Sequence, residues 1–465
     1  RDDYANMREA REEPGKLVRF TASHGRPLYG ALLETSLAKI DDIDRLWMPR
    51  LACVMLFTVI GLALWRQLYH SGWSEIEAAA IGLGVTLLPG AQVITSWAIA
   101  WPHAVALLLS LAGFSAIETE LERGGLKRLI AMAGGAMIYA LAALLYQSNA
   151  LFAVVPFAAV LLVRVSRGSS SDLRWSLIHS SALFVGLMGA YLLVGALFAN
   201  GVFHASARMQ LEMNPFTKLI WFFTKPLPNA LGLFALRDDF NYGSWIFWLA
   251  MSVVVLVIIW GSWAEIKRAG RTAKRRILFC ALILPFLAHF VSLAAAERAI
   301  GYRTLFALSG LVLVLLVFAL RSLLAAEKIK PAHHHGALLT LALLAVMSAH
   351  YYPHALIAVP EGYELDAMRT PVMRASFPKT AKVYIITPTI EDRATKRIYA
   401  DEFGAVASDS DWAPREMFKA VLHERYPIKL PKGTHPTVIL GRQPPAPDKY
   451  DLVIDMRNFK DEASR

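Results

Sequence analysis

Long apolar stretches without a single charge constrain this chain more than any other feature of its sequence. Four of them are Leu51–Trp65, Ala182–Phe198, Trp245–Trp260 and Leu305–Leu320. A helix needs roughly 20 mainly apolar residues to cross about 30 Å of hydrocarbon. The chain is 55% hydrophobic and 18% charged, whereas soluble domains are about 45–50% apolar and roughly 25% charged. The sequence therefore predicts a polytopic α-helical membrane protein.

Ten segments are apolar and long enough to be expected as membrane spans. They are residues 50–69, 76–94, 97–117, 127–146, 149–165, 177–199, 245–263, 277–296, 302–324 and 336–356. The sequence opens at Arg1 without a Met, and the polar stretch 1–48 precedes the first span. We therefore expect a further transmembrane helix ahead of Arg1.

The distribution of positive charge predicts which loops share a side of the membrane. The formal net charge is +11. Basic residues are concentrated in alternate loops, at Arg123, Lys127 and Arg128; Arg164, Arg167 and Arg174; Lys267, Arg268, Arg271, Lys274, Arg275 and Arg276; and Arg321, Lys328 and Lys330. Cytoplasmic loops carry such an excess of Lys and Arg, so we expect both ends of the chain to face outward. The charge then reflects orientation, and we predict no nucleic-acid partner.

The chain is expected to have three parts, at residues 1–48, 49–356 and 357–465. The first is an outward loop whose residues 1–27 read as irregular. Pro27 is well placed to begin a helix, and apolar residues recur after it at helical spacing, at Leu28, Leu32, Leu33, Leu37, Ile40 and Ile43. This helix is predicted to lie flat in the membrane interface, with packing on an outward domain as the alternative. The second part is the transmembrane domain.

The third part, residues 357–465, is predicted to be a small soluble α/β domain. Lys382–Thr387, Thr437–Leu440 and Leu452–Asp455 read as short buried strands. Pro414–Arg425 reads as a helix. This part has no Gly-rich phosphate loop and no metal-binding motif, so we assign it no chemistry. The outward loop 200–244 is too long for a bare connector and could cover a cavity.

Two charged groups on the outward side are candidates for chemistry. The pair Asp2-Asp3 would stand at the mouth of the membrane domain, where a carboxylate can take a proton from a hydroxyl group. Arg298 and Arg303 flank a short outward loop, where arginines either bind a phosphate or extend to the lipid headgroups. Further polar residues on the same side are Arg26, His103, Gln147 and Tyr302.

The order of these features resembles the GT-C superfamily of integral membrane glycosyltransferases, in which an acidic pair in the first outward loop precedes an interfacial helix. Asp2-Asp3, then Gly25-Arg26-Pro27-Leu28, then Tyr146-Gln147 closing a span, resemble the Gtr-type glucosyltransferases that modify O-antigen. These motifs lie within residues 1–165, and the remaining spans resemble the family in layout alone. One departure is His103, near a turn that often carries an acid in relatives.

The resemblance implies an inverting transfer of a sugar, glucose above all, from a polyprenyl phosphate to a periplasmic glycan such as O-antigen. By analogy, Asp2 is the general base and Asp3 orients the acceptor. Arg298 or Arg303 would offset charge on the departing phosphate. Substrate-binding roles then fall to Arg26, His103, Gln147 and Tyr302. The expected location is a bacterial inner membrane, with the site facing the periplasm, and no cofactor or metal ion is predicted.

Three other classes of protein compete with this interpretation. An O-antigen polymerase or ligase would rely on basic residues in large outward loops. A transporter or flippase of lipid-linked sugars would carry ionisable residues deep within its spans, and the spans here are free of charge away from their ends. A scaffold that presents residues 357–465 would need fewer than ten spans. The acidic pair therefore favours the glycosyltransferase.

Overall fold

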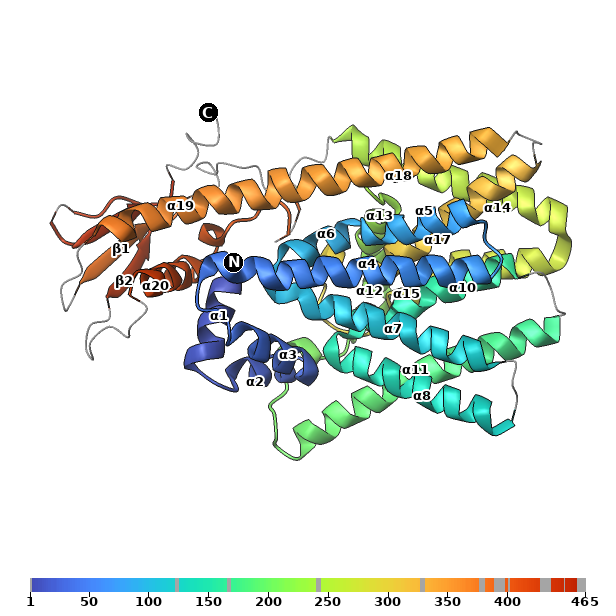
Figure 1. Cartoon of the computed structure of the whole chain (residues 1–465), viewed down its shortest axis with the longest axis horizontal. Coiled ribbons are helices and arrows are strands. Elements are labelled where there is room, and N and C mark those ends of the chain that lie inside the picture. Colours follow the sequence, from blue (N-terminus) through green and yellow to red (C-terminus); the bar gives the residue numbers. More distant parts are fainter. Residues whose placement is uncertain are drawn as a thin grey trace.

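The computed structural model describes residues 2–121, 125–164, 169–239, 244–326, 331–375, 381–388, 398–399, 402–426, 436–446 and 448–457. They form an elongated body, in which a bundle of long helices fills most of the length and a small sheet lies at one end (Figure 1). Helices α1, α2 and α3 lie at the end of the bundle that is nearer to the sheet.

Seven stretches of helix in the described part of the chain are long and apolar enough to cross a membrane. Each coincides with one of the ten expected spans. The first three are Ile43–His70 (η1, Ile43–Leu46, and α4, Trp47–His70), Ala98–Glu120 (η2, Ala98–Ala100, and α7, Trp101–Glu120) and Gly125–Leu145 (α8). The next three are Asp172–Ala199 in α11 (Ser169–Ala199), Trp245–Arg268 in α14 (Trp245–Leu278) and Phe306–Ala326 (α17). The last is Ala332–Arg374, which includes α18 (Pro331–Pro353), η8 (His354–Ala358) and α19 (Val359–Arg374).

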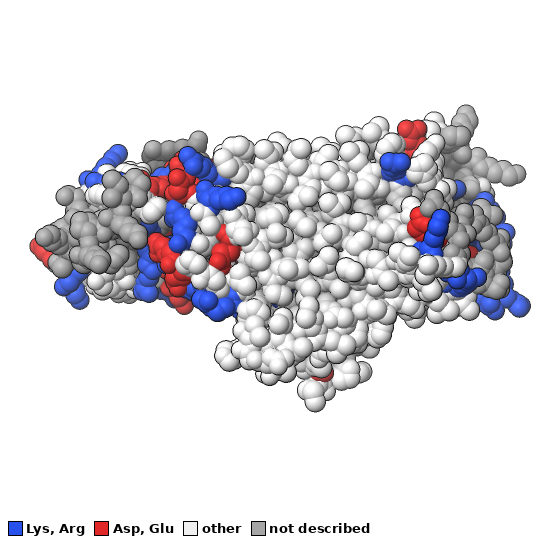
Figure 2. Space-filling model, turned by 60° about the horizontal axis from the view of Figure 1, so that its bottom comes forward, with Lys and Arg blue, Asp and Glu red and all other residues white. Residues whose placement is uncertain are grey.

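The surface of the bundle has the character of a lipid-facing surface. Figure 2 shows a broad belt with almost no Lys, Arg, Asp or Glu between two charged ends. Large apolar side chains are exposed on it, such as Met55 and Leu62 of α4, which are 62% and 59% exposed. An apolar patch of this extent is not stable in water, but it suits contact with hydrocarbon. The chain is therefore a multi-pass membrane protein that is surrounded by a lipid bilayer.

The other three expected spans are helical but interrupted. In chain order they comprise α5 (Glu75–Thr86) and α6 (Pro89–Ser96), bent by 47°; α9 (Gln147–Ala150), η4 (Leu151–Ala153) and α10 (Val154–Val163); and the end of α14, the π-turn η6 (Phe279–Ile283), α15 (Leu284–Ala288) and α16 (Phe290–Ala294). Pro89 and Pro285 contribute to two of these breaks, because proline lacks the backbone N–H that a continuous helix uses. The expected number of ten spans is therefore corrected to seven in the described part of the chain, or eight if α5 and α6 form one bent span.

The loop that was expected to face outward, residues 200–244, is partly helical over its described residues 200–239. It contains η5 (Ala207–Met209), α12 (Pro215–Thr224) and α13 (Pro226–Leu231). The Asn214 side chain caps α12 by accepting a hydrogen bond from the Thr217 N–H, at 3.1 Å. The buried Lys218 ammonium donates to the carbonyl oxygens of Ala295 and Glu297, both at 2.7 Å. These bonds fix the loop against the segment that follows α16.

The N-terminal part is more regular than its polar sequence suggests. Residues 2–23 form two helices, α1 (Asp2–Glu12) and α2 (Lys16–Ser23), so the expectation of an irregular stretch over 1–27 is wrong. Tyr4, Met7 and Ala10 recur every three residues and are buried, which gives α1 one apolar face. Helix α3 (Pro27–Leu37) begins at Pro27 as predicted, and it packs on α2, α1, α7 and α8.

The C-terminal part contains the three predicted strands in one parallel sheet. They are β1 (Lys382–Ile386), β2 (Thr437–Gly441) and β3 (Leu452–Asp455), in the order β2-β1-β3. The predicted helix is α20 (Ala413–Arg425), which provides the crossover that parallel strands require. Val383 and Ile385 of β1 are fully buried in one cluster with Met417, Phe418 and Val421 of α20. This cluster also includes Tyr4 and Met7, so α1 belongs to the same core.

The contact of the apolar belt with lipid can be tested by introducing one charged side chain. We expect Leu62→Arg in α4 to reduce the amount of folded protein recovered from membranes, because Arg near the centre of a membrane helix costs about 2.5–3.5 kcal/mol on insertion scales. The measurement is size-exclusion chromatography of detergent extracts. The matched control is Ile439→Arg on β2, an exposed apolar residue outside the belt. Equal recovery of both variants would contradict the assignment of α4 to the bilayer.

Candidate functional site

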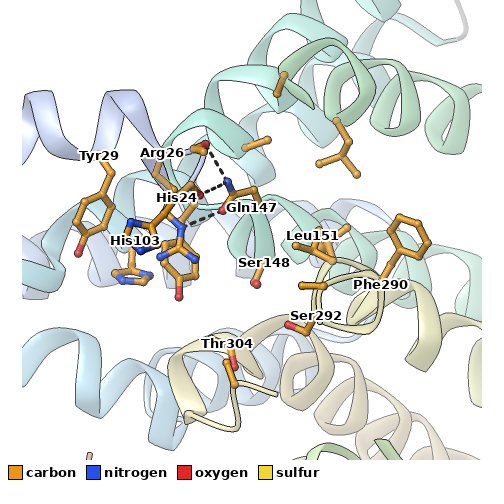
Figure 3. Close-up of a pocket in the computed structure, with 18 of the residues that line it drawn as sticks. His24, Arg26, Tyr29, His103, Gln147, Ser148, Leu151, Phe290, Ser292 and Thr304 are labelled. Carbon is orange, nitrogen blue, oxygen red and sulfur yellow. Dashed lines mark hydrogen bonds between the residues drawn. The ribbon is translucent and has the colours of Figure 1, made fainter. Parts of the chain in front are cut away.

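One large cavity of about 890 Å³ lies where the N-terminal helices meet the membrane bundle. Its walls come from α1 to α3, from α7 to α11, from α15 and α16, and from the segments around residues 208 and 301. Figure 3 shows His24, Arg26, Tyr29, His103 and Gln147 gathered on one side, with Leu151 and Phe290 on the other. The cavity thus has a polar end and an apolar end.

Arg26 and Gln147 form the centre of the polar end. The Gln147 amide donates to the carbonyl oxygens of His24 and Gly25, at 3.3 and 2.8 Å, and its own oxygen accepts from Arg26 Nε at 3.0 Å. The Arg26 guanidinium lies 4.1 Å from the centre of the Tyr146 ring, an arrangement that attracts a cation to the ring face. Two segments distant in sequence therefore hold one positive charge at the cavity.

His103 lies beside this pair in the first turn of α7. It is only 3% exposed, and its ring centre is 3.8 Å from that of Tyr146. Asn149 of α9 is within hydrogen-bond distance of His103 Nδ1, at 3.2 Å, and donates to its carbonyl oxygen at 3.3 Å. These contacts fix the position of the ring while one face of the residue lines the cavity.

Arg303 provides a second positive charge at the cavity. Its guanidinium lies 4.7 Å from the centre of the Trp97 ring and 3.3 Å from the Glu402 carboxylate. Glu402 is buried and also accepts the backbone N–H of Tyr302 at 2.5 Å. The charge of Arg303 is thus shared between the cavity and a residue of the C-terminal part.

The two members of the acidic pair face different surroundings. Asp2 lines the cavity. Asp3 is 5% exposed, and its carboxylate accepts the Ile99 N–H at 3.0 Å and lies 3.6 Å from Arg50. Successive residues of a helix point about 100° apart, so α1 directs only one of these two side chains to the cavity.

Two further predicted residues lie away from the cavity. Tyr302 is 2% exposed, its hydroxyl accepts the Arg237 N–H at 3.1 Å, and its ring packs on Tyr399. Arg298 is exposed and does not line the cavity. Of the predicted site residues, Asp2, Arg26, His103, Gln147 and Arg303 line the cavity, whereas Asp3, Arg298 and Tyr302 do not.

Sequence reasoning missed two residues at the polar end. His24 directly precedes Gly25-Arg26-Pro27, and its Nδ1 lies 2.7 Å from the Phe20 carbonyl oxygen. Burial, together with the positive charges of Arg26 and Arg208, lowers the pKa of His24, so this side chain is neutral at pH 7. Arg208 also lines the cavity and pairs with Glu297 at 3.4 Å. The sequence signal that could have indicated Arg208 was its positive charge in the loop 200–244.

The apolar end continues between the helices of the membrane bundle. Along α11, cavity-lining residues run from Val194 to His179, which corresponds to about 22 Å of helix axis at 1.5 Å per residue. The facing walls are provided by residues such as Phe157, Leu284, Leu287 and Phe290. A polar end with three arginines, namely Arg26, Arg208 and Arg303, and a long apolar arm suit a molecule that has an anionic head and a hydrocarbon chain.

Comparison of the chain with models of protein families, with curated proteins and with solved structures gives no match. Fold and cavity define a class: a multi-pass helical membrane protein with an amphipathic cavity at one end of its bundle. Among the residues that the structure describes, no three His, Cys, Asp or Glu side chains are grouped so that they can hold a metal ion.

The polar end depends on a glycine. Gly25 has φ of +75°, and a Cβ there would lie 2.9 Å from Gln147 Nε2. We expect Gly25→Ala to displace Gln147 and to raise hydrogen–deuterium exchange around residues 146–148, because a side chain at this position meets both backbone strain of about 1–2 kcal/mol and a close contact. The control is Gly201→Ala, where φ is +70° and no atom lies within 4 Å. An identical exchange pattern in both variants would contradict this role.

Proposed function

We propose that this protein is an inverting membrane glycosyltransferase of the GT-C kind, which moves a sugar from a polyprenyl phosphate to a glycan. The observation that carries the proposal is the cavity itself, which combines Asp2, three arginines and a long apolar arm. A polyprenyl-phosphate sugar has the matching parts, namely a hydrocarbon chain, a phosphate and a sugar. We expect the sugar to be a hexose such as glucose and the acceptor to resemble O-antigen.

Three polar residues of the cavity, Asp2, Arg26 and Arg303, have roles in the proposed reaction. Asp2 takes the proton of an acceptor hydroxyl, whose oxygen attacks the anomeric carbon of the donor. The bond between that carbon and the phosphate oxygen breaks, and its electron pair leaves with the polyprenyl phosphate. Arg26 and Arg303 stabilise the charge on the phosphate, which is worth most in a site with little water. The remaining advantage comes from holding both substrates in line.

The proposed orientation follows from the distribution of charge. The ends of α7, α10, α14 and α17 that adjoin the basic loops lie at the end of the bundle away from the sheet (Figure 1). Positive loops are typical of the cytoplasmic side. We therefore place the polar end of the cavity and residues 357–465 on the periplasmic side of a bacterial inner membrane.

If Asp2 is the general base, a small change of its side chain should cause a large loss of turnover. We expect Asp2→Asn to lower kcat by about 10²–10⁴, the usual contribution of a general base, with unchanged folding. The measurement is transfer from polyprenyl-phosphate sugars to lipopolysaccharide glycan by purified protein.

The control is Asp41→Asn, an acid that is 65% exposed and outside the cavity. Wild-type turnover in the Asp2→Asn variant would exclude Asp2 as the general base. Binding of the lipid by folded wild-type protein without transfer to any acceptor would favour a transporter of lipid-linked sugars instead.

Donor binding can be tested on two arginines of one short segment. We expect Arg303→Gln to weaken binding of polyprenyl phosphate by about 10- to 100-fold, because a hydrogen bond to a charged group contributes about 1.5–3 kcal/mol. Arg298→Gln is the matched control, since this arginine is exposed and outside the cavity. The measurement is a binding titration in lipid nanodiscs. Equal affinity of both variants would place the phosphate elsewhere.

A further inference from the structure

Helix α1 connects the cavity with the C-terminal part of the chain. Its first turn carries Asp2, which lines the cavity. Its apolar face, with Tyr4, Met7 and Ala10, packs in the cluster that contains Met417 and Phe418 of α20. A helix is stiff over this length, so a shift of the contact with α20 would also move the end that carries Asp2.

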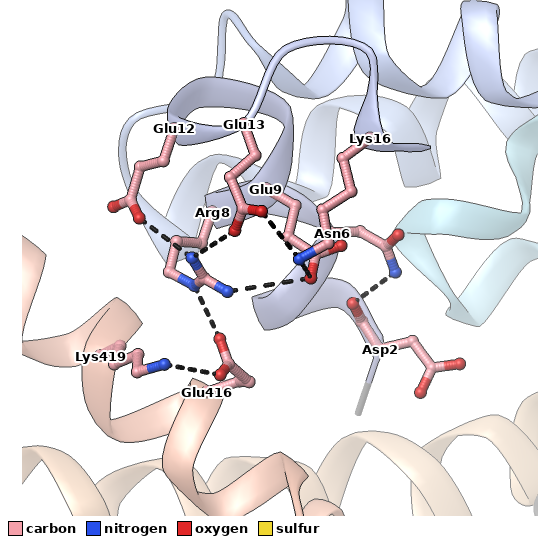
Figure 4. Close-up of polar contacts among 9 residues, drawn as sticks. All are labelled: Asp2, Asn6, Arg8, Glu9, Glu12, Glu13, Lys16, Glu416 and Lys419. Carbon is pink, nitrogen blue, oxygen red and sulfur yellow. Dashed lines mark hydrogen bonds and ion pairs between the residues drawn. The ribbon is translucent and has the colours of Figure 1, made fainter. Parts of the chain in front are cut away.

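A largely buried ion pair strengthens the contact between α1 and α20. Arg8 Nε donates to Glu416 Oε2 at 2.7 Å, and each side chain is 14% exposed. Figure 4 shows Arg8 between Glu416 and the acidic residues Glu9, Glu12 and Glu13, while the Asp2 carboxylate points away from this group. Of these four carboxylates, Glu416 is the one that comes from the C-terminal part. Glu12 and Glu13 also pair with Arg8, and Lys419 also pairs with Glu416, so a change of either partner removes the link between α1 and α20 without leaving the other charge unpaired.

The first turn of α1, which carries Asp2, is also fixed to the membrane bundle. Asp3 accepts the Ile99 N–H at 3.0 Å and lies 3.6 Å from Arg50 of α4. Arg50 also lies 3.7 Å from Glu361 in the first turn of α19. Asp2 therefore projects from a helix that is held at one end by the bundle and along its side by the C-terminal part.

We propose that Arg8 and Glu416 are positioning residues, through which the C-terminal part holds α1 so that Asp2 faces the cavity. This inference rests on the function proposed above for Asp2. It assigns a role in catalysis to a part of the chain that carries no catalytic motif of its own. The expected consequence is a defect in turnover without a defect in donor binding when the pair is broken.

The test is a double-mutant cycle with Arg8→Gln, Glu416→Gln and both together. Each change should lower kcat by about tenfold, less than the roughly 100-fold that a displacement of 1 Å can cost, and leave the KM for the donor unchanged. The double variant should be no slower than the single ones, because both changes remove the same contact. Hydrogen–deuterium exchange of residues 2–13 should rise in all three variants.

The chain offers a matched control on the same carboxylate. Lys419 also pairs with Glu416, at 2.8 Å, but it belongs to α20 itself. Lys419→Gln should therefore leave kcat and the exchange of α1 as in the wild type. Wild-type kcat and exchange in Arg8→Gln and Glu416→Gln, or an equal loss in Lys419→Gln, would overturn the proposal.

The exchange experiment separates this inference from the proposed function. Suppose that wild-type protein transfers no sugar from any donor, while hydrogen–deuterium exchange in α1 still rises in the variants. The proposed glycosyl transfer is then excluded, but the ion pair still positions α1. If the wild type transfers sugar and the variants match it, the reaction holds and the positioning role is overturned. Thermal unfolding midpoints close to that of the wild type show that the variants are folded.

Discussion

The absence of water from the hydrocarbon core is the constraint on which the rest of this structure depends. Backbone N–H and C=O groups in that region must bond to each other, so spans are helical, and irregular backbone is tolerated only inside the protein or along a cavity. The interrupted spans follow this rule. Residues at the breaks after α8 and around α15 and α16, such as Ser148, Leu151 and Ser292, line the cavity. These two breaks therefore lie beside the cavity, whereas the break between α5 and α6, at Leu88, is buried within the protein.

The same constraint explains how charged groups are held at the cavity. Arg26 and Arg303 lie against the aromatic rings of Tyr146 and Trp97. Each also contacts an oxygen of another segment, from Gln147 and Glu402 respectively. Such contacts fix a guanidinium in place and leave part of its charge available to an anion. A phosphate that enters the polar end would then meet cations that need little rearrangement, which is the condition for strong electrostatic stabilisation.

Local patterns in the sequence predict much of the fold and a part of the candidate site. The strands, α20 and the start of α3 at Pro27 follow from runs of apolar residues and from one proline, because these signals act over a few residues. Helices α1 and α2 were missed, since their stability comes from Met7 and Leu17, which are buried against distant parts of the chain. Tyr302 and Arg303 are neighbours in sequence, yet only Arg303 reaches the cavity, and this depends on the turn η7 (Tyr302–Thr304) and on Glu402. No local pattern contains that information.

The C-terminal part contacts both sides of the polar end, and this gives a physical reason for its presence. Glu402 pairs with Arg303 on one wall, and Glu416 pairs with Arg8 on the helix that carries Asp2. The two carboxylates are 14 positions apart in the sequence (416 minus 402), in the segment that includes α20. In the proposed reaction, Asp2 and Arg303 must keep a fixed separation, and loops alone hold such a separation poorly. A packed segment that contacts both elements can hold it.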